Sequence, residues 1–282
     1  MSKRKPLWAR ILLGIFNTVL SVVVLFLAFS AFLYFKYKIN TFKVINHIRI
    51  LNQKVDTDSL ITKPFSDSDL TTAKAKIDVV SILLPELVIT DKEVGAYINN
   101  TIQENKDGQI VDFGSIKIDL LDYGFKVEQV EFVLPTSEEV DKLADFNIVL
   151  KINLEKLKTD RMNKFPYNWI KGIVPNELYF SSTVEIFKND EEGALYDYKI
   201  ESKSLLINNL DSKDTEEIFD GLNNFSSVGK VDNFNKSICT PFVDALIGNS
   251  ENPGIAYSLI KVGAISYSFE KIGNQVCFVV KK

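Results

Sequence analysis

The longest apolar stretch of the chain runs from Ile11 to Phe35, as ILLGIFNTVLSVVVLFLAFSAFLYF, and contains no charged residue. A helix of these 25 residues reaches roughly 38 Å, enough to cross a hydrocarbon core about 30 Å thick with some tilt. A cleaved signal peptide has a shorter apolar region followed by a small-residue cleavage site, which Ala28-Phe29-Ser30 resembles. Because the apolar run continues to Phe35, the pattern favours an uncleaved transmembrane helix over a cleaved signal or a buried core helix.

Basic residues flank this stretch on both sides, so counting charges does not decide its orientation. They are Lys3, Arg4, Lys5 and Arg10 before it and Lys36, Lys38, Lys43 and Arg49 after it. A short basic tail before the first span usually stays inside, and a long following domain can translocate whatever its charge. We therefore expect a cytoplasmic tail (1–10), a single-pass signal-anchor in the cell membrane (11–35) and an extracytoplasmic main domain.

Apolar residues recur every three positions after the anchor, which keeps one face of a helix apolar to about Lys54. These residues are Ile39, Phe42, Ile45, Ile48 and Leu51. The next segment, 56–69, has Pro64 among Ser, Thr and Asp, a composition typical of a linker. The pattern predicts a helical stalk and linker over 36–70 and a globular domain over 71–282.

The globular domain opens with an apolar, β-branched run, Ile77 to Ile89, which predicts a strand with an edge or bend at Pro85. Thr90-Asp91-Lys92-Glu93 follows as a capping box, with Ile89 and Val94 at the hydrophobic-staple positions. A helix should therefore begin at Asp91 and fray by Asn105. Its inner face should carry Val94, Tyr97, Ile98, Thr101 and Ile102.

Alternation of apolar and polar residues predicts strands along most of the remaining chain. The alternating segments are 116–120, 125–134, 146–154, 178–186 and 196–200, and later 265–269 and 276–280. Within 125–134 the alternation changes phase, which a β-bulge at Glu128-Gln129 would correct. A hairpin connection is expected at 189–193.

Two helical segments interrupt the strands. One should begin at Ser212, and the second carries an apolar stripe from Phe234 to Leu246 that Thr240-Pro241 either kinks or restarts. Short connections between the strands leave no room for repeated crossover helices. The predicted fold is therefore α+β, with a curved antiparallel sheet packed on helices.

Charge is unevenly distributed along the chain. Residues 1–54 hold nine basic residues and no acidic one, so the remainder carries 24 basic and 37 acidic residues, a net charge of −13. An acidic body repels nucleic acid and anionic headgroups. This distribution disfavours nucleic acid as a partner.

Candidate chemistry is sparse. Cys239 and Cys277 either form a disulfide, which an oxidising compartment permits, or stay as two small buried side chains. His47, in the stalk, either titrates near neutral pH or is a bystander. With one His and no Cys-x-x-Cys pair, the chain lacks the usual zinc ligands, so we expect no metal and no cofactor.

No catalytic motif is complete. Ser227-Val-Gly-Lys230 matches the Ser-x-x-Lys pattern of penicillin-binding enzymes, but the companion Ser-Asp-Asn and Lys-Thr-Gly elements are absent from the sequence. The sequence also has no Gly-x-Ser-x-Gly elbow, phosphate loop or His-Glu-x-x-His helix. We therefore expect a protein that is not an enzyme.

Two stretches carry a resemblance to a known group. Leu87-Val-Ile-Thr-Asp-Lys-Glu-Val-Gly-Ala-Tyr-Ile98 resembles the opening of the YpmS-like and AsmA-like membrane-anchored envelope proteins. Gly172-Ile-Val-Pro-Asn-Glu-Leu178, followed by two strands and a helix, is similar in order to the later half of that group. The group in turn resembles the tubular lipid-binding (TULIP) class, in which lipid chains lie between a long helix and a bent sheet.

The resemblance, over about residues 77–247, implies a lipid-binding envelope protein. An acyl chain would lie in an apolar groove and lose its contact with water. The groove residues expected from the inward-facing pattern are Val94, Tyr97, Ile98, Ile102, Phe132, Ile148, Leu150 and Ile152. Each of them has an alternative role as ordinary core, and the alternative function is an anchored scaffold that binds a protein partner in the envelope.

Overall fold

The computed structural model describes the chain from residue 41 onward, with gaps. The described residues are 41–80, 85–104, 110–112, 117–119, 124–136, 141–160, 171–188, 198–223, 230–249, 254–259, 263–264 and 266–281. The helices are α2 (Thr41–Leu51), α3 (Thr57–Leu60), α4 (Asp67–Val80), α5 (Asp91–Glu104), α6 (Glu155–Asp160), α7 (Ser212–Asn223), α8 (Val231–Leu246) and α9 (Ile255–Leu259). The strands are β1 (Glu86–Thr90), β2 (Ile110–Asp112), β3 (Lys117–Asp119), β4 (Lys126–Val133), β5 (Lys142–Asn153), β6 (Glu177–Lys188), β7 (Tyr198–Ile207), β8 (Ser266–Ile272) and β9 (Gln275–Lys281).

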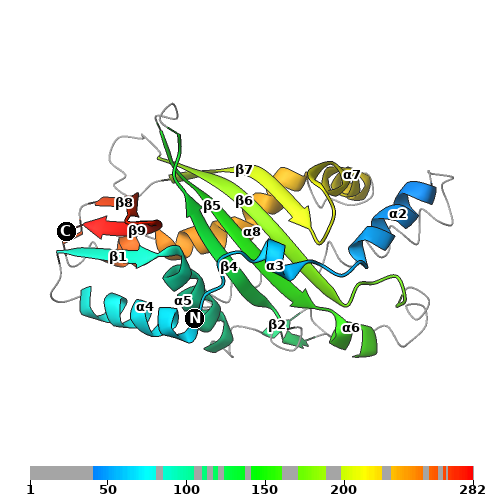
Figure 1. Cartoon of the computed structure of the whole chain (residues 1–282), viewed down its shortest axis with the longest axis horizontal. Helices are drawn as coiled ribbons and strands as arrows, with labels where there is room; N and C mark the ends of the chain where they lie inside the picture. The colour runs from blue at the N-terminus through cyan, green and yellow to red at the C-terminus, as the bar shows by residue number, and fades with distance from the viewer. Residues whose placement is uncertain are drawn as a thin grey trace, which may run out of the picture.

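The largest layer is a curved antiparallel sheet of four strands in the order β4-β5-β6-β7 (Figure 1). Helix α5 packs on β4, while α8 packs on β6 and β7. The predicted bulge is present, because the register between β4 and β5 shifts between Val127 and Gln129. The shift brings Val127 and Val130 to the same buried face, as the phase change in the sequence indicated.

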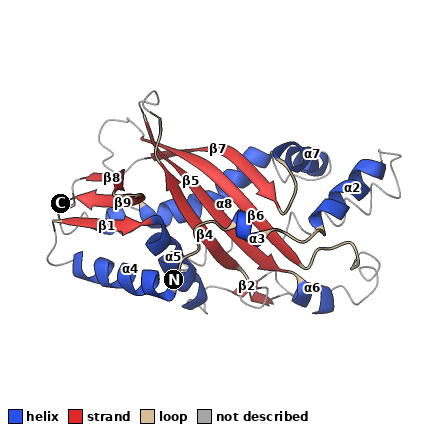
Figure 2. Cartoon of the chain, in the orientation of Figure 1, coloured by secondary structure: helices blue, strands red, loops and turns tan. Residues whose placement is uncertain are grey.

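A second sheet pairs the first strand of the fold with the last two. Its order is β1-β9-β8, and β1 pairs antiparallel with the last strand, with Ile89 opposite Phe278. Figure 2 shows this sheet at one end of the long axis and α2 at the other. Aromatic contacts link the two sheets, since the Phe269 ring lies 5.0 Å from Phe132 and 5.3 Å from Phe278 between centroids. The α+β class with curved antiparallel sheets is therefore confirmed.

Residues 52–66, which we call the strap, cross the sheet face that α5 and α8 leave uncovered. At one end of the strap, the Asn52 side chain donates to the carbonyl of Ile173 at 2.8 Å. At its other end, the Lys63 amide donates to Gln129 at 2.8 Å and the Lys63 ammonium pairs with Glu131 at 2.6 Å. The segment predicted as a linker is thus packed against the domain and includes α3 (Figure 1).

The prediction of a strand beginning at Ile77 is wrong for its first residues, because α4 continues to Val80 and β1 begins only at Glu86. A capping interaction determines where α4 begins. The Ser66 amide donates to the Asp69 carboxylate at 2.7 Å, the reciprocal half of a capping arrangement in which Asp replaces the usual Glu. Packing of α4 on α5 then overrides the weak strand preference of β-branched residues.

Helix α8 passes through Pro241 without a break. Thr240 uses its hydroxyl to bond the Lys236 carbonyl at 2.7 Å, one turn back, so no new N-cap forms there. The helix is fixed to the sheet by the buried side chain of Asn235. Its amide nitrogen lies 2.8 Å from the Thr183 carbonyl and 3.0 Å from the Ser204 carbonyl, where the β6–β7 register shifts.

Several sequence predictions fall outside the described residues: the anchor at 11–35, the hairpin at 189–193 and Ser227. Among the helices that the structure describes, all after residue 40, none combines the length and the hydropathy of a membrane span.

Candidate functional site

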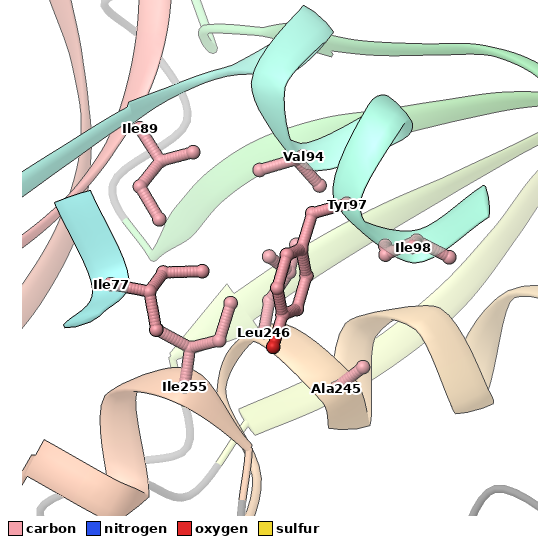
Figure 3. A pocket seen from close by; sticks show the side chains of 8 residues that line it. All are labelled: Ile77, Ile89, Val94, Tyr97, Ile98, Ala245, Leu246 and Ile255. Atoms are coloured by element: carbon pink, nitrogen blue, oxygen red, sulfur yellow. The ribbon is translucent and has the colours of Figure 1, made fainter. Parts of the chain in front are cut away.

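An apolar pocket lies where α4, β1, α5, α8 and α9 meet (Figure 3). The cavity has a volume of about 10 Å³, room for roughly one water. Every lining side chain is hydrocarbon apart from one phenol. The lining residues are Ile77, Ile89, Val94, Tyr97, Ile98, Ala245, Leu246 and Ile255.

The capping box sets the direction of α5 and so of its pocket residues. The Glu93 amide donates to the Thr90 hydroxyl at 3.2 Å, and the Thr90 amide donates to the Glu93 carboxylate at 2.9 Å. Both bonds are those predicted from the sequence. With the start of the helix fixed, Val94, Tyr97 and Ile98 fall three and four residues apart on one face and line the pocket (Figure 3).

A neighbouring side of α5 receives the end of the strap. A Cβ atom on Gly95 would lie 2.7 Å from Cδ1 of Phe65, so only glycine leaves room for this ring. Phe65 in turn packs against the core at the point where the strap ends and α4 begins. The strap therefore leads directly into the helix that forms one wall of the pocket.

That wall, α4, contributes Ile77 to the pocket and is joined to α5 by charge. The Lys76 ammonium lies 2.7 Å from the Glu93 carboxylate, whose side chain is only 8% exposed. Glu93 thus serves two elements, since it caps α5 and binds α4. A second pair, Lys74 with Glu104 at 3.2 Å, lies in solvent.

The far wall combines the end of α8 with α9. A Cβ atom on Gly254 would lie 2.3 Å from the Asp244 carbonyl oxygen, so glycine permits the close approach of the two helices. The Tyr257 amide donates to the Ile247 carbonyl at 3.0 Å and holds α9 in place. This arrangement brings Ile255 to the pocket beside Leu246 (Figure 3).

One ionisable group, Tyr97, lines the pocket, and a second, Asp244, precedes a lining residue in the sequence. Burial raises the pKa of Tyr97 above its usual value, and the nearby charge of Asp78 raises it further. The Tyr97 phenol therefore stays neutral at physiological pH, and Figure 3 shows its ring extending from α5 toward α8. Burial also raises the pKa of Asp244 to about 6, and the Tyr198 hydroxyl donates to that carboxylate. Asp244 immediately precedes the pocket residue Ala245.

Three of the eight predicted groove residues line this pocket: Val94, Tyr97 and Ile98. The other five lie in the core shared by α5 and the four-stranded sheet, with 6% or less of their surface exposed: Ile102, Phe132, Ile148, Leu150 and Ile152. Among the pocket residues absent from that prediction, Ile77 and Ile89 belong to the apolar run before α5. Ala245 and Ile255 carried no signal in the sequence, because their approach to α5 depends on tertiary packing.

The two cysteines are free and both are buried. Cys239, on α8, lies 2.9 Å from the Ser182 hydroxyl of β6, and Cys277 is on β9 opposite Thr90. Of the two alternatives for these residues, the structure has two separate buried thiols rather than a bridge. Burial raises the pKa of Cys239 to about 12, so its sulfur remains a thiol at physiological pH.

Comparison of the chain with known proteins finds no matching family model, no matching curated protein and no matching solved structure. The resemblance to YpmS-like and AsmA-like proteins stays a prediction from the layout of the sequence.

Proposed function

We propose that this chain is a membrane-tethered, non-enzymatic envelope protein that binds an apolar ligand, such as a lipid, by the end of its chain. The observation that carries the proposal is the pocket, where five separate elements bring hydrocarbon side chains around one hollow. Apolar pockets with few polar groups are the usual form of small-ligand sites. The Tyr97 hydroxyl is the polar exception within it.

The size of the hollow limits what it accepts. Pockets for drug-sized molecules span about 300–1,000 Å³, whereas this cavity, at about 10 Å³, holds only about one water-sized group. It therefore admits only the last group of an acyl chain, and a longer stretch of chain requires α4 to move away from α5 and α8. Each buried methylene contributes about 0.8 kcal/mol, so a few of them hold a chain weakly enough to release it.

The position of the pocket supports transfer rather than permanent anchoring. Helix α2 follows the predicted membrane anchor in the sequence, and it lies at the end of the long axis opposite α4 and β1 (Figure 1). A chain end held between α4 and α8 would thus be removed from the end of the domain that bears the tether.

Native mass spectrometry of the full chain, purified from membranes in mild detergent, tests the proposal. We expect a fraction of the protein to carry co-purified lipid. In Ala245→Leu, the added side chain fills the hollow and displaces about two methylenes of ligand, which lowers affinity for a dansyl-labelled undecanoic acid about tenfold. Val133→Leu, on a side chain that is 40% exposed, is the matched control and should bind like the wild type.

Dense packing of the inner sheet face favours a second candidate, the anchored scaffold that binds a protein partner. Phe132, Ile148 and Leu150 are each 1% exposed or less, which leaves no slot between sheet and helices at that point. A lipid-free mass together with equal fatty-acid binding by Ala245→Leu and wild type would contradict the lipid proposal and leave the scaffold.

A further inference from the structure

A polar cluster joins α2 to α7 at the other end of the molecule from the pocket (Figure 1). His47 of α2 lies with Nε2 3.1 Å from Oδ1 of Asp214 on α7. One helical turn away on each helix, the Lys43 ammonium lies 3.1 Å from both carboxylate oxygens of Glu217. Because α2 follows the predicted anchor, this cluster connects the tether to the body.

The cluster brings three potential metal ligands close together. One ligand atom each from His47, Asp214 and Glu217 lies within 4.8 Å of the other two. Zinc binds imidazole nitrogen and carboxylate oxygen at about 2.0–2.2 Å, which places neighbouring ligands of a tetrahedral ion about 3.4 Å apart. Adjustment of flexible carboxylate rotamers by about an ångström therefore closes the triad around an ion.

The three ligands are differently constrained. His47 is 8% exposed, so its ring is fixed in place between the helices. Asp214 and Glu217 are three residues apart on α7 and so lie side by side on one helix face. A buried imidazole that faces two adjacent carboxylates provides three ligands and leaves the fourth position for water, the arrangement of an open zinc site.

We propose that His47, Asp214 and Glu217 bind a divalent transition-metal ion of the Zn²⁺ class, which clamps α2 onto α7. Lys43 occupies Glu217 when the ion is absent, and its side chain is 59% exposed, so it can swing into solvent when a metal takes its place. Lys43 is then a built-in competitor for the site. The expectation of no metal rested on ligand spacing in sequence, whereas these ligands come from helices that are about 167 residues apart.

The proposal gives α2 a metal-dependent attachment. Without the ion, α2 is held by the burial of Leu51 in the core and by polar contacts, including the Asn208 side chain donating to the Leu51 carbonyl at 2.7 Å. With the ion, a tripod of coordinate bonds fixes the direction in which α2 leaves the body.

Titration of the full chain in detergent, stripped of metal with EDTA, against ZnCl₂ and a chromophoric chelator tests the site. We expect saturation at one Zn²⁺ per chain. His47→Gln keeps a hydrogen-bond donor for Asp214 but removes the imidazole, and should lower zinc affinity at least tenfold. Glu217→Gln, on a side chain that is 33% exposed, is the second variant, in case His47→Gln does not fold.

Lys43→Met separates a metal site from a simple ion-pair cluster. Removal of the competitor should raise zinc affinity several-fold, while Lys199→Met, which removes the exposed partner of Glu201, should leave it unchanged. The proposal is overturned if zinc does not saturate at one ion per chain. It is equally overturned if folded His47→Gln or Glu217→Gln binds like the wild type, or if Lys43→Met binds more weakly.

Discussion

At the scale of single residues, the protonation of Asp244 on α8 affects the stability of the fold. Its folded pKa of about 6 lies above the value of about 3.9 expected in an unfolded chain. The folded state therefore holds this proton more tightly. Between pH 4 and pH 6 the stability that Asp244 contributes falls as pH rises, and above pH 6 the folded state bears the full cost of a half-buried carboxylate.

Replacing this carboxylate gives the first prediction. Asp244→Asn keeps an acceptor for the Tyr198 hydroxyl and removes the charge, so it should stabilise the fold by about 1 kcal/mol at pH 8 and have no such effect at pH 4. Urea unfolding of both proteins at the two pH values measures the difference. Asp220→Asn, on an exposed position of α7, is the control. Equal stabilisation at both pH values would show that the charge of Asp244 is not the cause.

At the scale of elements, α4 is the part of the pocket most open to change. It buries Ala73 completely, Leu70 and Ile77 are only partly buried, and two ion pairs join it to α5. In the Lys76–Glu93 pair, the Glu93 side chain is largely buried from water. In the second pair, Lys74 and Glu104 are 42% and 65% exposed. Shielding from water strengthens an ion pair, so the two pairs should differ in coupling energy.

A double-mutant cycle tests this difference. Lys76→Met and Glu93→Gln, alone and together, should give a coupling energy of about 1 kcal/mol, because the glutamine still reaches the Thr90 amide and only the ion pair is lost. Lys74→Met with Glu104→Gln should give about 0.3 kcal/mol. The free energy of unfolding in urea provides both values. If the exposed pair has as large a coupling energy as the Lys76–Glu93 pair, burial of Glu93 does not strengthen the ion pair between α4 and α5.

The sequence predicted those features of the fold that depend on residues close together in the chain. The capping bonds of Thr90 and Glu93 and the bulge beside Val127 follow from residues within a few positions of each other, and both are present. Helix α4 was missed because its start is set by Ser66 and Asp69, in a segment that reads as a linker. Only the α5 residues of the pocket were predicted, because α5 has a local pattern. Ala245 and Ile255 reach the site through Gly254 and the packing of α9.

At the scale of the whole molecule, the pairing of β1 with β9 closes the fold. The two strands are almost 190 residues apart, and no alternation pattern specifies which strand pairs with which, so the sequence did not predict this contact. Strand β9 is the centre of its sheet and buries Cys277 to Val280. Its Phe278 ring also reaches Phe269, which contacts Phe132 of the four-stranded sheet. One short strand at the end of the chain thus joins both sheets.

This arrangement predicts that the domain cannot fold cooperatively until its last strand is present. A chain that ends at Gly273 leaves β1 and β8 without a partner and exposes the aromatic junction, so it should lose its sigmoidal urea transition by circular dichroism. A chain that ends at Val280 loses the Lys281–Glu270 ion pair, which is 45% and 38% exposed, and should keep its sigmoidal transition. A cooperative transition in the shorter chain would mean that the four-stranded sheet with α5 and α8 is stable by itself. In that case the pocket, which needs Ile89 of β1, would be an addition to an independent body rather than part of one folding unit.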